Sequence, residues 1–165
     1  MKIIVNDTNI LIDLMNISLL DVFLELDFEF HTNDLIINEI TDIEQKAIIN
    51  KVISENKLIV NETKAEDYPR IISLLINNLS IEDCSIWYYA QQIEGVLLTG
   101  DARLRKEVEK TKVEVRGVLF VFDKLIEENK ITKNNAINKL TELLNINPRL
   151  PKKEIKKRIE LWSSL

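Results

Sequence analysis

The stretch MKIIVNDTNILID (residues 1–13) decides the expected fold. Its residues 2–6, KIIVN, form a short β-branched run typical of a strand, and helical periodicity begins directly after Asp7. A carboxylate at such a junction is costly to bury unless a positive charge or hydrogen bonds satisfy it. Strand-like and helix-like segments continue to alternate along the chain. Asp7 is the first of several acidic residues that lie where a strand-like segment gives way to a helix-like one.

Further apolar runs predict four more strands, and the segments between them have helical patterns. Such an alternation predicts crossover connections and a parallel sheet covered by helices on both faces, an α/β fold. In the helix expected over 43–55, Ile43, Ala47, Ile48 and Val52 share one side. The other strands are expected at 28–32, 57–63, 94–100 and 113–117, and the other helices at 8–26 in two pieces, 33–40, 65–77, 80–92, 118–129, 132–145 and 152–163.

Four acids occupy positions where apolar segments give way to helices: Asp7, Glu39, Asp83 and Asp101. If they converge, each close pair repels by about 4 kcal/mol at an effective dielectric of 20. A bound divalent cation reverses the sign of that interaction, and an oxygen-only ligand set selects Mg²⁺ or Mn²⁺ over zinc. The four acids therefore predict a metal-binding cluster at the carboxyl edge of the sheet, where ligands of such sheets bind.

Helix capping is the alternative explanation for three of these acids. Asp7 can cap the helix that it precedes, Asp101 can form an Asx turn or a cap, and residues 80–83 match a capping box. Glu39 has the weakest local explanation, because it stands among isoleucines on a half-buried face. Glu82 competes with Asp83 for the inward position.

Composition narrows the class of protein. The 165 residues fit one domain, 45% are hydrophobic, and no run reaches the roughly 18 apolar residues that span a bilayer. One cysteine and one histidine exclude a disulfide framework and multi-His or Cys-rich metal sites. The start of the chain is typical of a first strand rather than a signal peptide, so we expect a cytoplasmic protein.

The charge of the chain is unevenly distributed. The net charge is −5, but residues 149–165 hold six basic and two acidic residues. This basic segment is either a patch that contacts a phosphate backbone or a solvated helix face.

Four motifs in this order resemble the PIN-domain family of metal-dependent nucleases: VNDTNILID (5–13), an acid about thirty residues further on, LSIEDCSIWYYAQ (79–91) and LLTGDARL (97–104). The resemblance implies a three-layer α/β/α sandwich with a parallel sheet over residues 1–125. The remaining residues 126–165 are then a C-terminal extension of extra helices packed on the same domain. Many small members of the family resemble VapC-type toxins of toxin–antitoxin pairs.

Carried over by position, the resemblance implies a site, a reaction and partners. Asp7, Glu39, Asp83 and Asp101 are the catalytic acids, and Asp7, Asp83 and Asp101 among them bind Mg²⁺ or Mn²⁺. Asn9 and Thr99 support the cluster, Arg103 and Arg105 hold substrate phosphates or simply begin an exposed helix, and Asp13 is expected to face solvent. The implied reaction is hydrolysis of RNA phosphodiester bonds, and the implied partners are an RNA substrate, a cognate antitoxin and a second copy in a homodimer, with no membrane contact.

Three other classes compete with a nuclease. A PIN fold whose acidic cluster no longer catalyses a reaction would serve as a protein-binding module. A receiver-like signalling domain needs a phosphorylatable Asp at the end of a middle strand and a late lysine, and neither is clear. A phosphatase of the haloacid-dehalogenase type needs D-x-D, whereas this chain has Asp7-Thr8-Asn9.

Overall fold

The computed structural model describes residues 1–164 and is built around a five-stranded sheet in the order β3-β2-β1-β4-β5. Every neighbouring pair is parallel, as the sequence predicts. The two apolar strands β1 and β4 lie at the centre, so Asp7 and Asp101 follow adjacent strands. The strands are β1 Lys2–Asn6, β2 Phe28–Asn33, β3 Ile59–Asn61, β4 Val96–Leu98 and β5 Val115–Arg116.

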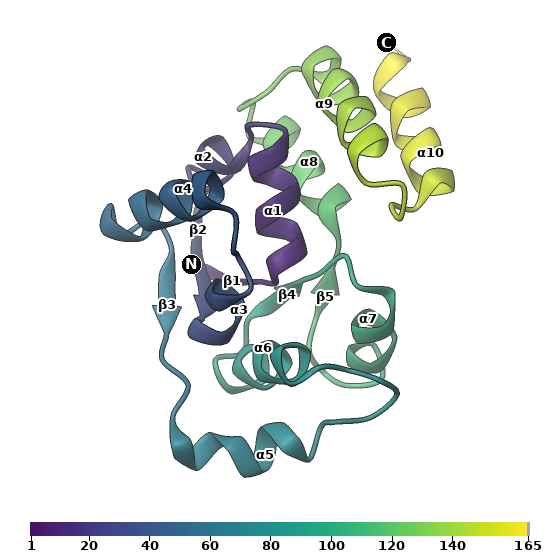
Figure 1. Cartoon of the computed structure of the whole chain (residues 1–165). Coiled ribbons are helices and arrows are strands. Elements are labelled where there is room, and N and C mark those ends of the chain that lie inside the picture. The colour runs from purple at the N-terminus through teal and green to yellow at the C-terminus, as the bar shows by residue number, and fades with distance from the viewer. Residues whose placement is uncertain (165) are drawn as a thin grey trace.

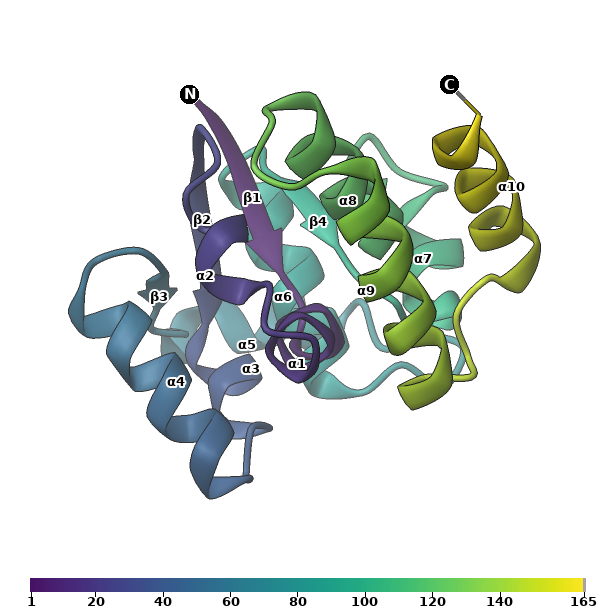
Figure 2. The ribbon, with the colours of Figure 1, turned by 90° about the horizontal axis from the view of Figure 1, so that it is seen from above.

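Helices cover both faces of the sheet and confirm the predicted three-layer α/β/α arrangement (Figure 1). On one face α6 contacts β1, β2 and β4, and α3 and α5 contact α6. On the other face α1 contacts α2 and α4, and α8 contacts α2 and α9 (Figure 2). The bounds are α1 Thr8–Asn16, α2 Leu20–Phe23, α3 Asp34–Asn38, α4 Ile43–Ser54, η1 Ala65–Asp67, α5 Tyr68–Ile72, α6 Ile81–Gln92, α7 Ala102–Val108, α8 Val118–Glu127, α9 Lys133–Ile146 and α10 Lys152–Ser163.

Two helical predictions are wrong in detail. The side of α4 that meets the core carries Ile49 and Val52, whereas Ile43 is 84% exposed and Ile48 is 39% exposed. The helix expected over 65–77 is the short η1 followed by α5, which ends at Ile72. Four further residues separate α5 from Asn77, which has a positive φ of 50° that a continuing helix excludes.

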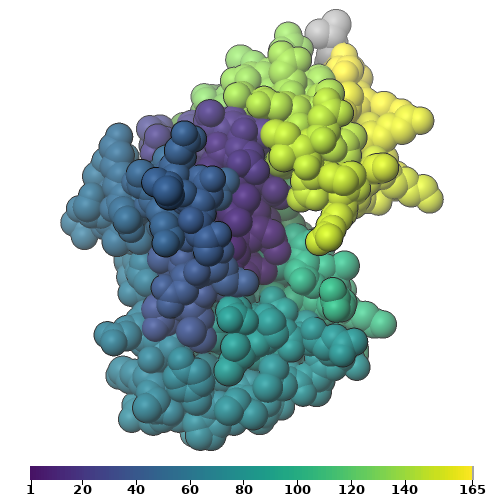
Figure 3. All heavy atoms as spheres, viewed as in Figure 1, coloured from purple at the N-terminus to yellow at the C-terminus, as the bar shows by residue number. Residues whose placement is uncertain are grey.

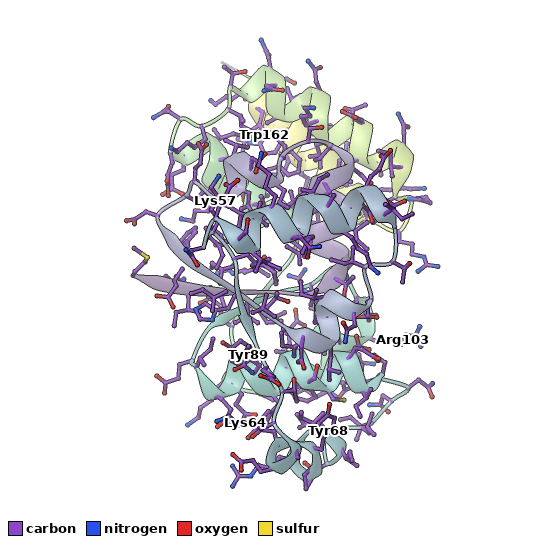
Figure 4. The ribbon with its side chains drawn as sticks, turned by 60° about the vertical axis from the view of Figure 1, so that its left-hand side comes forward. Lys57, Lys64, Tyr68, Tyr89, Arg103 and Trp162 are labelled. Carbon is purple, nitrogen blue, oxygen red and sulfur yellow. The ribbon has the colours of Figure 1, made fainter. Side chains whose placement is uncertain are left out.

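The C-terminal helices pack against the sheet layer through α8. Trp162 of α10, labelled in Figure 4, is buried and its ring centroid lies 6.2 Å from that of Phe122 in α8. Helix α8 runs across residue 125, so the division into 1–125 and 126–165 remains a prediction, and residue 165 lies outside the described residues. Within residues 1–164, every helix is too short or too polar to cross a membrane.

Gly95 allows β4 to approach β1 closely. A Cβ atom at Gly95 would lie 2.8 Å from Val5 Cγ2 and 3.3 Å from Ile3 Cγ2. We expect Gly95→Ala to lower the free energy of unfolding by about 1–3 kcal/mol, because the clash falls in a packed core. Urea unfolding measures this. In a Val5→Ala background the methyl group is gone, so the extra cost of Gly95→Ala should shrink; an equal cost in both backgrounds contradicts this explanation.

Candidate functional site

Asp7 occupies the junction between β1 and α1 at the carboxyl edge of the sheet. Its N–H continues the pairing of the central strands by donating to the carbonyl of Leu98 at 3.0 Å. Its side chain caps α1, since Oδ1 accepts from the N–H of Thr8 at 2.8 Å. Asp7 therefore has the capping role that the sequence offers as an alternative. It is also buried, with 3% of the residue exposed.

Thr99 and Asn9 connect Asp7 to the loop after β4. The Thr99 hydroxyl donates to Asp7 Oδ2 at 2.7 Å and accepts from the N–H of Asp101 at 3.0 Å. Asn9 Nδ2 donates to Asp7 Oδ2 at 3.2 Å, and Asn9 Oδ1 accepts from the N–H of Gly100 at 2.7 Å. Both residues predicted to support the cluster therefore bridge the two central strand ends and fix Asp7 relative to Asp101.

Asp101 and Asp83 are each held by a helix start and keep one oxygen free. Asp101 Oδ1 accepts from the N–H groups of Arg103 and Leu104 at 2.8 and 3.0 Å. Asp83 Oδ2 accepts from the N–H of Ser80 at 2.9 Å in the predicted capping box. Within residues 1–164, neither Asp101 Oδ2 nor Asp83 Oδ1 accepts a hydrogen bond from the protein.

Glu39 reaches the cluster from α3, where it follows the last helical residue. Glu39 is exposed. The expectation that it lies on a half-buried face among isoleucines is therefore wrong. The Thr8 hydroxyl donates to Glu39 Oε1 at 2.7 Å and links α3 to the start of α1. Thr8 is a site residue that the sequence reasoning missed, and its place directly after Asp7 was the available signal.

The charges of neighbouring carboxylates raise the pKa values of Asp7 and Asp83. Burial raises the pKa of Asp7 from 3.8 to about 7, against the lowering effect of the Thr99 and Thr8 hydrogen bonds, and the charges of Asp83 and Glu39 raise it further. Burial followed by the charge of Asp101 raises the pKa of Asp83. These mutual effects place all four predicted acids in one negative region.

Glu82 is a fifth acid of this region. After burial, its charge is the main cause that raises the pKa of Glu39, and it also raises the pKa of Asp83. The sequence offered Glu82 as a competitor of Asp83, whereas the structure brings both into the same negative field. Cys84, beside them in α6, is buried, and burial raises the pKa of its thiol to about 11, so it is not a thiolate at neutral pH.

The donor set fits a hydrated Mg²⁺ or Mn²⁺ ion. It consists of carboxylate and hydroxyl oxygens, with buried negative charge and carboxylate oxygens that lack hydrogen bonds. Over residues 1–164, no three acidic, histidine or cysteine side chains are close enough to enclose an ion by themselves. An ion here would keep part of its water shell, which is the usual state of Mg²⁺ on one or two carboxylates.

The remaining sequence predictions concern Asp13 and two arginines. Asp13 does not face solvent: it is 6% exposed and accepts from Asn147 Nδ2 at 3.2 Å. Arg103 extends outward from the start of α7 (Figure 4), and Arg105 lies one turn along from Asp101, with Nε donating to Glu109 Oε1 at 3.1 Å. The two arginines thus differ in environment although the sequence treats them alike.

The fold and site define a parallel α/β protein with an acidic centre at the carboxyl edge of its sheet. A family model described as a PIN domain matches residues 3–164, and the chain belongs to the PIN-domain family, whose fold is of the nuclease type. Among solved structures it is similar to a PilT N-terminus domain protein from the hyperthermophilic archaeon Sulfolobus solfataricus P2, with 10% identity and a TM-score of 0.46 over 72% of this chain and 89% of that one. No curated protein matches it significantly.

Proposed function

We propose that the chain is a metal-dependent endoribonuclease that hydrolyses RNA phosphodiester bonds. The observation that carries the proposal is the gathering of Asp7, Glu39, Asp83 and Asp101 in one negative region, in which the Thr8 and Thr99 hydroxyls hydrogen-bond to Glu39 and Asp7. Such a region repels a phosphodiester unless a cation is present, and with a cation it becomes a place where phosphate charge is neutralised. Membership of a family with a nuclease-type fold supports the same conclusion.

In this proposal each side chain has a distinct task. Mg²⁺, when bound, supplies Lewis-acid neutralisation of the phosphate and lowers the pKa of a bound water. Asp7 and Asp101 would hold the ion, and Thr99 and Asn9 fix the position of Asp7 relative to the loop that carries Asp101. Asp83 binds the ion or orients the attacking water through its free oxygen.

The outer groups hold the ion and the substrate. Glu39 would help to hold the ion through water, and the Thr8 hydroxyl fixes its Oε1. Arg103 and Arg105 hold substrate phosphates beside Asp101. In-line attack by water then gives 5′-phosphate and 3′-hydroxyl ends, because the leaving oxygen belongs to the preceding ribose.

The test is cleavage of a labelled RNA by the purified full chain with Mg²⁺, with Mn²⁺ and with EDTA. We expect cleavage with either ion, none with EDTA, and products that a 5′-phosphate-dependent exonuclease degrades. Cleavage that resists EDTA, or 2′,3′-cyclic phosphate ends, would reject the mechanism. Titration calorimetry with Mn²⁺ separates the enzyme from an inactive PIN-fold binding module, which would bind no ion.

We also infer a biological role as the toxin of a toxin–antitoxin pair, with a cognate antitoxin as partner and a homodimer as the assembly. Its support is the motif resemblance alone. A short reading frame beside the gene, encoding a DNA-binding or disordered protein, is the expected observation. Its absence would remove the toxin role and leave the nuclease proposal unchanged.

A further inference from the structure

A cleft of about 520 Å³ opens beside the acidic site, between the sheet layer and the C-terminal helices. It begins at Thr99 and Gly100, the turn that presents Asp101. From there it passes between α1 and the loop at residues 147–151, with the starts of α7 and α8 on its other side. In Figure 3 the C-terminal segment (yellow-green) lies beside α1 (purple) and above the green segment that contains α7 and β5. The cleft is therefore continuous with the acidic site and lies outside it.

Two contacts between distant parts of the chain fix the walls of this cleft. Arg158 of α10 makes a paired interaction with Asp123 of α8, with Nε to Oδ1 at 3.0 Å and Nη2 to Oδ2 at 2.8 Å. Asn147, at the end of α9, donates to both carboxylate oxygens of Asp13 in α1. Because the walls are tied at α8 and at α1, the cleft exists before any ligand binds and little ordering is needed for binding.

Four arginines from separate segments line the cleft, and Arg158 is the one that is paired with Asp123. Among residues 1–164, Arg105 and Arg116 pair only with the exposed carboxylates of Glu109 and Glu114, each at 3.1 Å from the arginine Nε. Such exposed pairs are worth little and leave the other guanidinium N–H groups available. Within residues 1–164, the side chain of Arg149 has no ion-pair partner. The start of α8 in the same cleft adds N–H groups that no side chain caps.

These donors favour a phosphate backbone over an apolar partner. A guanidinium fork matches two phosphate oxygens. The acceptors Asp13 and Asp123 are already bonded to Asn147 and Arg158. The third carboxylate of the lining, Glu154, lies 3.8 Å from Lys157, so the donors of the cleft outnumber its remaining acceptors. The apolar lining combines the buried Ile10, Val118 and Leu150, which are 0%, 4% and 8% exposed, with the partly exposed Leu119 and Phe120. A ligand of this cleft must therefore offer both anionic and apolar groups, as a nucleotide does with its phosphate and its base.

We propose that this cleft binds the nucleotide next to the scissile phosphate of a single-stranded RNA, with Arg105, Arg116 and Arg149 on its backbone phosphates. The proposal rests on the nuclease function above for the position of the scissile phosphate. The volume suits a ligand of nucleotide size. The chain then selects single strands by its shape, because a duplex does not enter a cleft of this size.

The test is fluorescence anisotropy with a 5′-fluorescein RNA of roughly 12 nucleotides, titrated in EDTA so that no cleavage occurs. The variant Arg116→Glu/Arg149→Glu changes two exposed side chains of the cleft, and we expect its Kd to rise by at least about tenfold. Arg70→Glu, an exposed arginine of α5 at the far end of the molecule (Figure 1), is the matched control and should keep the wild-type Kd. Circular dichroism confirms that both variants are folded.

The outcomes separate this proposal from the nuclease function. Equal RNA affinity of the wild type and the double variant overturns the cleft proposal, whether or not the chain cleaves RNA. The cleft would then bind a protein partner or no partner. Cleft-dependent binding without cleavage in Mg²⁺ or Mn²⁺ supports the cleft and rejects the nuclease. Cleavage by the double variant with an unchanged kcat/KM supports the nuclease and rejects the cleft.

Discussion

Asp7→Asn is expected to lower RNA cleavage by about 1,000-fold or more while the chain stays folded. The substitution keeps an oxygen for the N–H of Thr8, so α1 remains capped. It removes the buried negative charge that would hold the ion, and it places an NH₂ group against the Thr99 hydroxyl. Single-turnover cleavage at saturating enzyme measures the loss, and the thermal midpoint reports the fold.

Asp42→Asn is the matched control for Asp7→Asn. Asp42 also caps a helix, with Oδ1 accepting from the N–H of Gln45 at 2.9 Å, but it is exposed and belongs to α4. We expect Asp42→Asn to cleave RNA at the wild-type rate. Full activity in Asp7→Asn, or an equal loss in both variants, would show that the acid at the β1 end has no part in catalysis.

Without metal, the free energy of unfolding should fall as pH rises from about 4 to about 7. In that window folded Asp7, with a pKa of about 7, keeps a proton that the unfolded side chain, with a pKa near 3.8, has already lost. The folded state therefore binds more protons, and Asp7 contributes a loss of up to about 4 kcal/mol that is complete above pH 7. Asp83 and Glu39 are shifted in the same direction. Urea unfolding in EDTA at about pH 5 and about pH 8 measures the difference.

Two additional measurements assign this pH dependence to the site. Asp7→Asn should remove most of the loss, since the variant has no group to titrate at that position. Mn²⁺ at about pH 8 should stabilise the wild type and have little effect on Asp7→Asn, because an ion that binds the folded state alone shifts the equilibrium towards it. A pH dependence of equal size in the variant would assign the loss to other groups.

The sheet could be predicted from the sequence because its strands are short apolar runs separated by helical patterns. The face of α4 could not, since isoleucines and valine lie on more than one side of this helix. Ile49 and Val52 meet the core, and the sequence favoured a set that includes the exposed Ile43. Local periodicity located the helix, whereas the choice between two apolar stripes depends on where the neighbouring elements lie.

The acids of the site could be located by their motifs, but their surroundings depended on long-range contacts. Asp13 is expected to face solvent because it lies one and a half helical turns beyond Asp7, but its hydrogen-bond partner, Asn147, is 134 positions away. The cleft beside the site depends on that contact and on the pair between Arg158 and Asp123. Neither pairing has a local signal, so the acids of the candidate site could be predicted from the sequence and the cleft next to them could not.

The double role of Asp7 and Asp101 as helix N-caps and as acids of the candidate site has a consequence for how this protein can evolve. Asn, Ser and Asp are nearly equivalent as N-caps, so an Asn or Ser at either position would remove a proposed metal-binding carboxylate and keep the helix start. A lineage that loses the proposed activity can therefore keep its fold by using neutral capping residues. Among relatives of this chain, such residues at the starts of α1 and α7 would mark the descendants that retain the fold for another purpose.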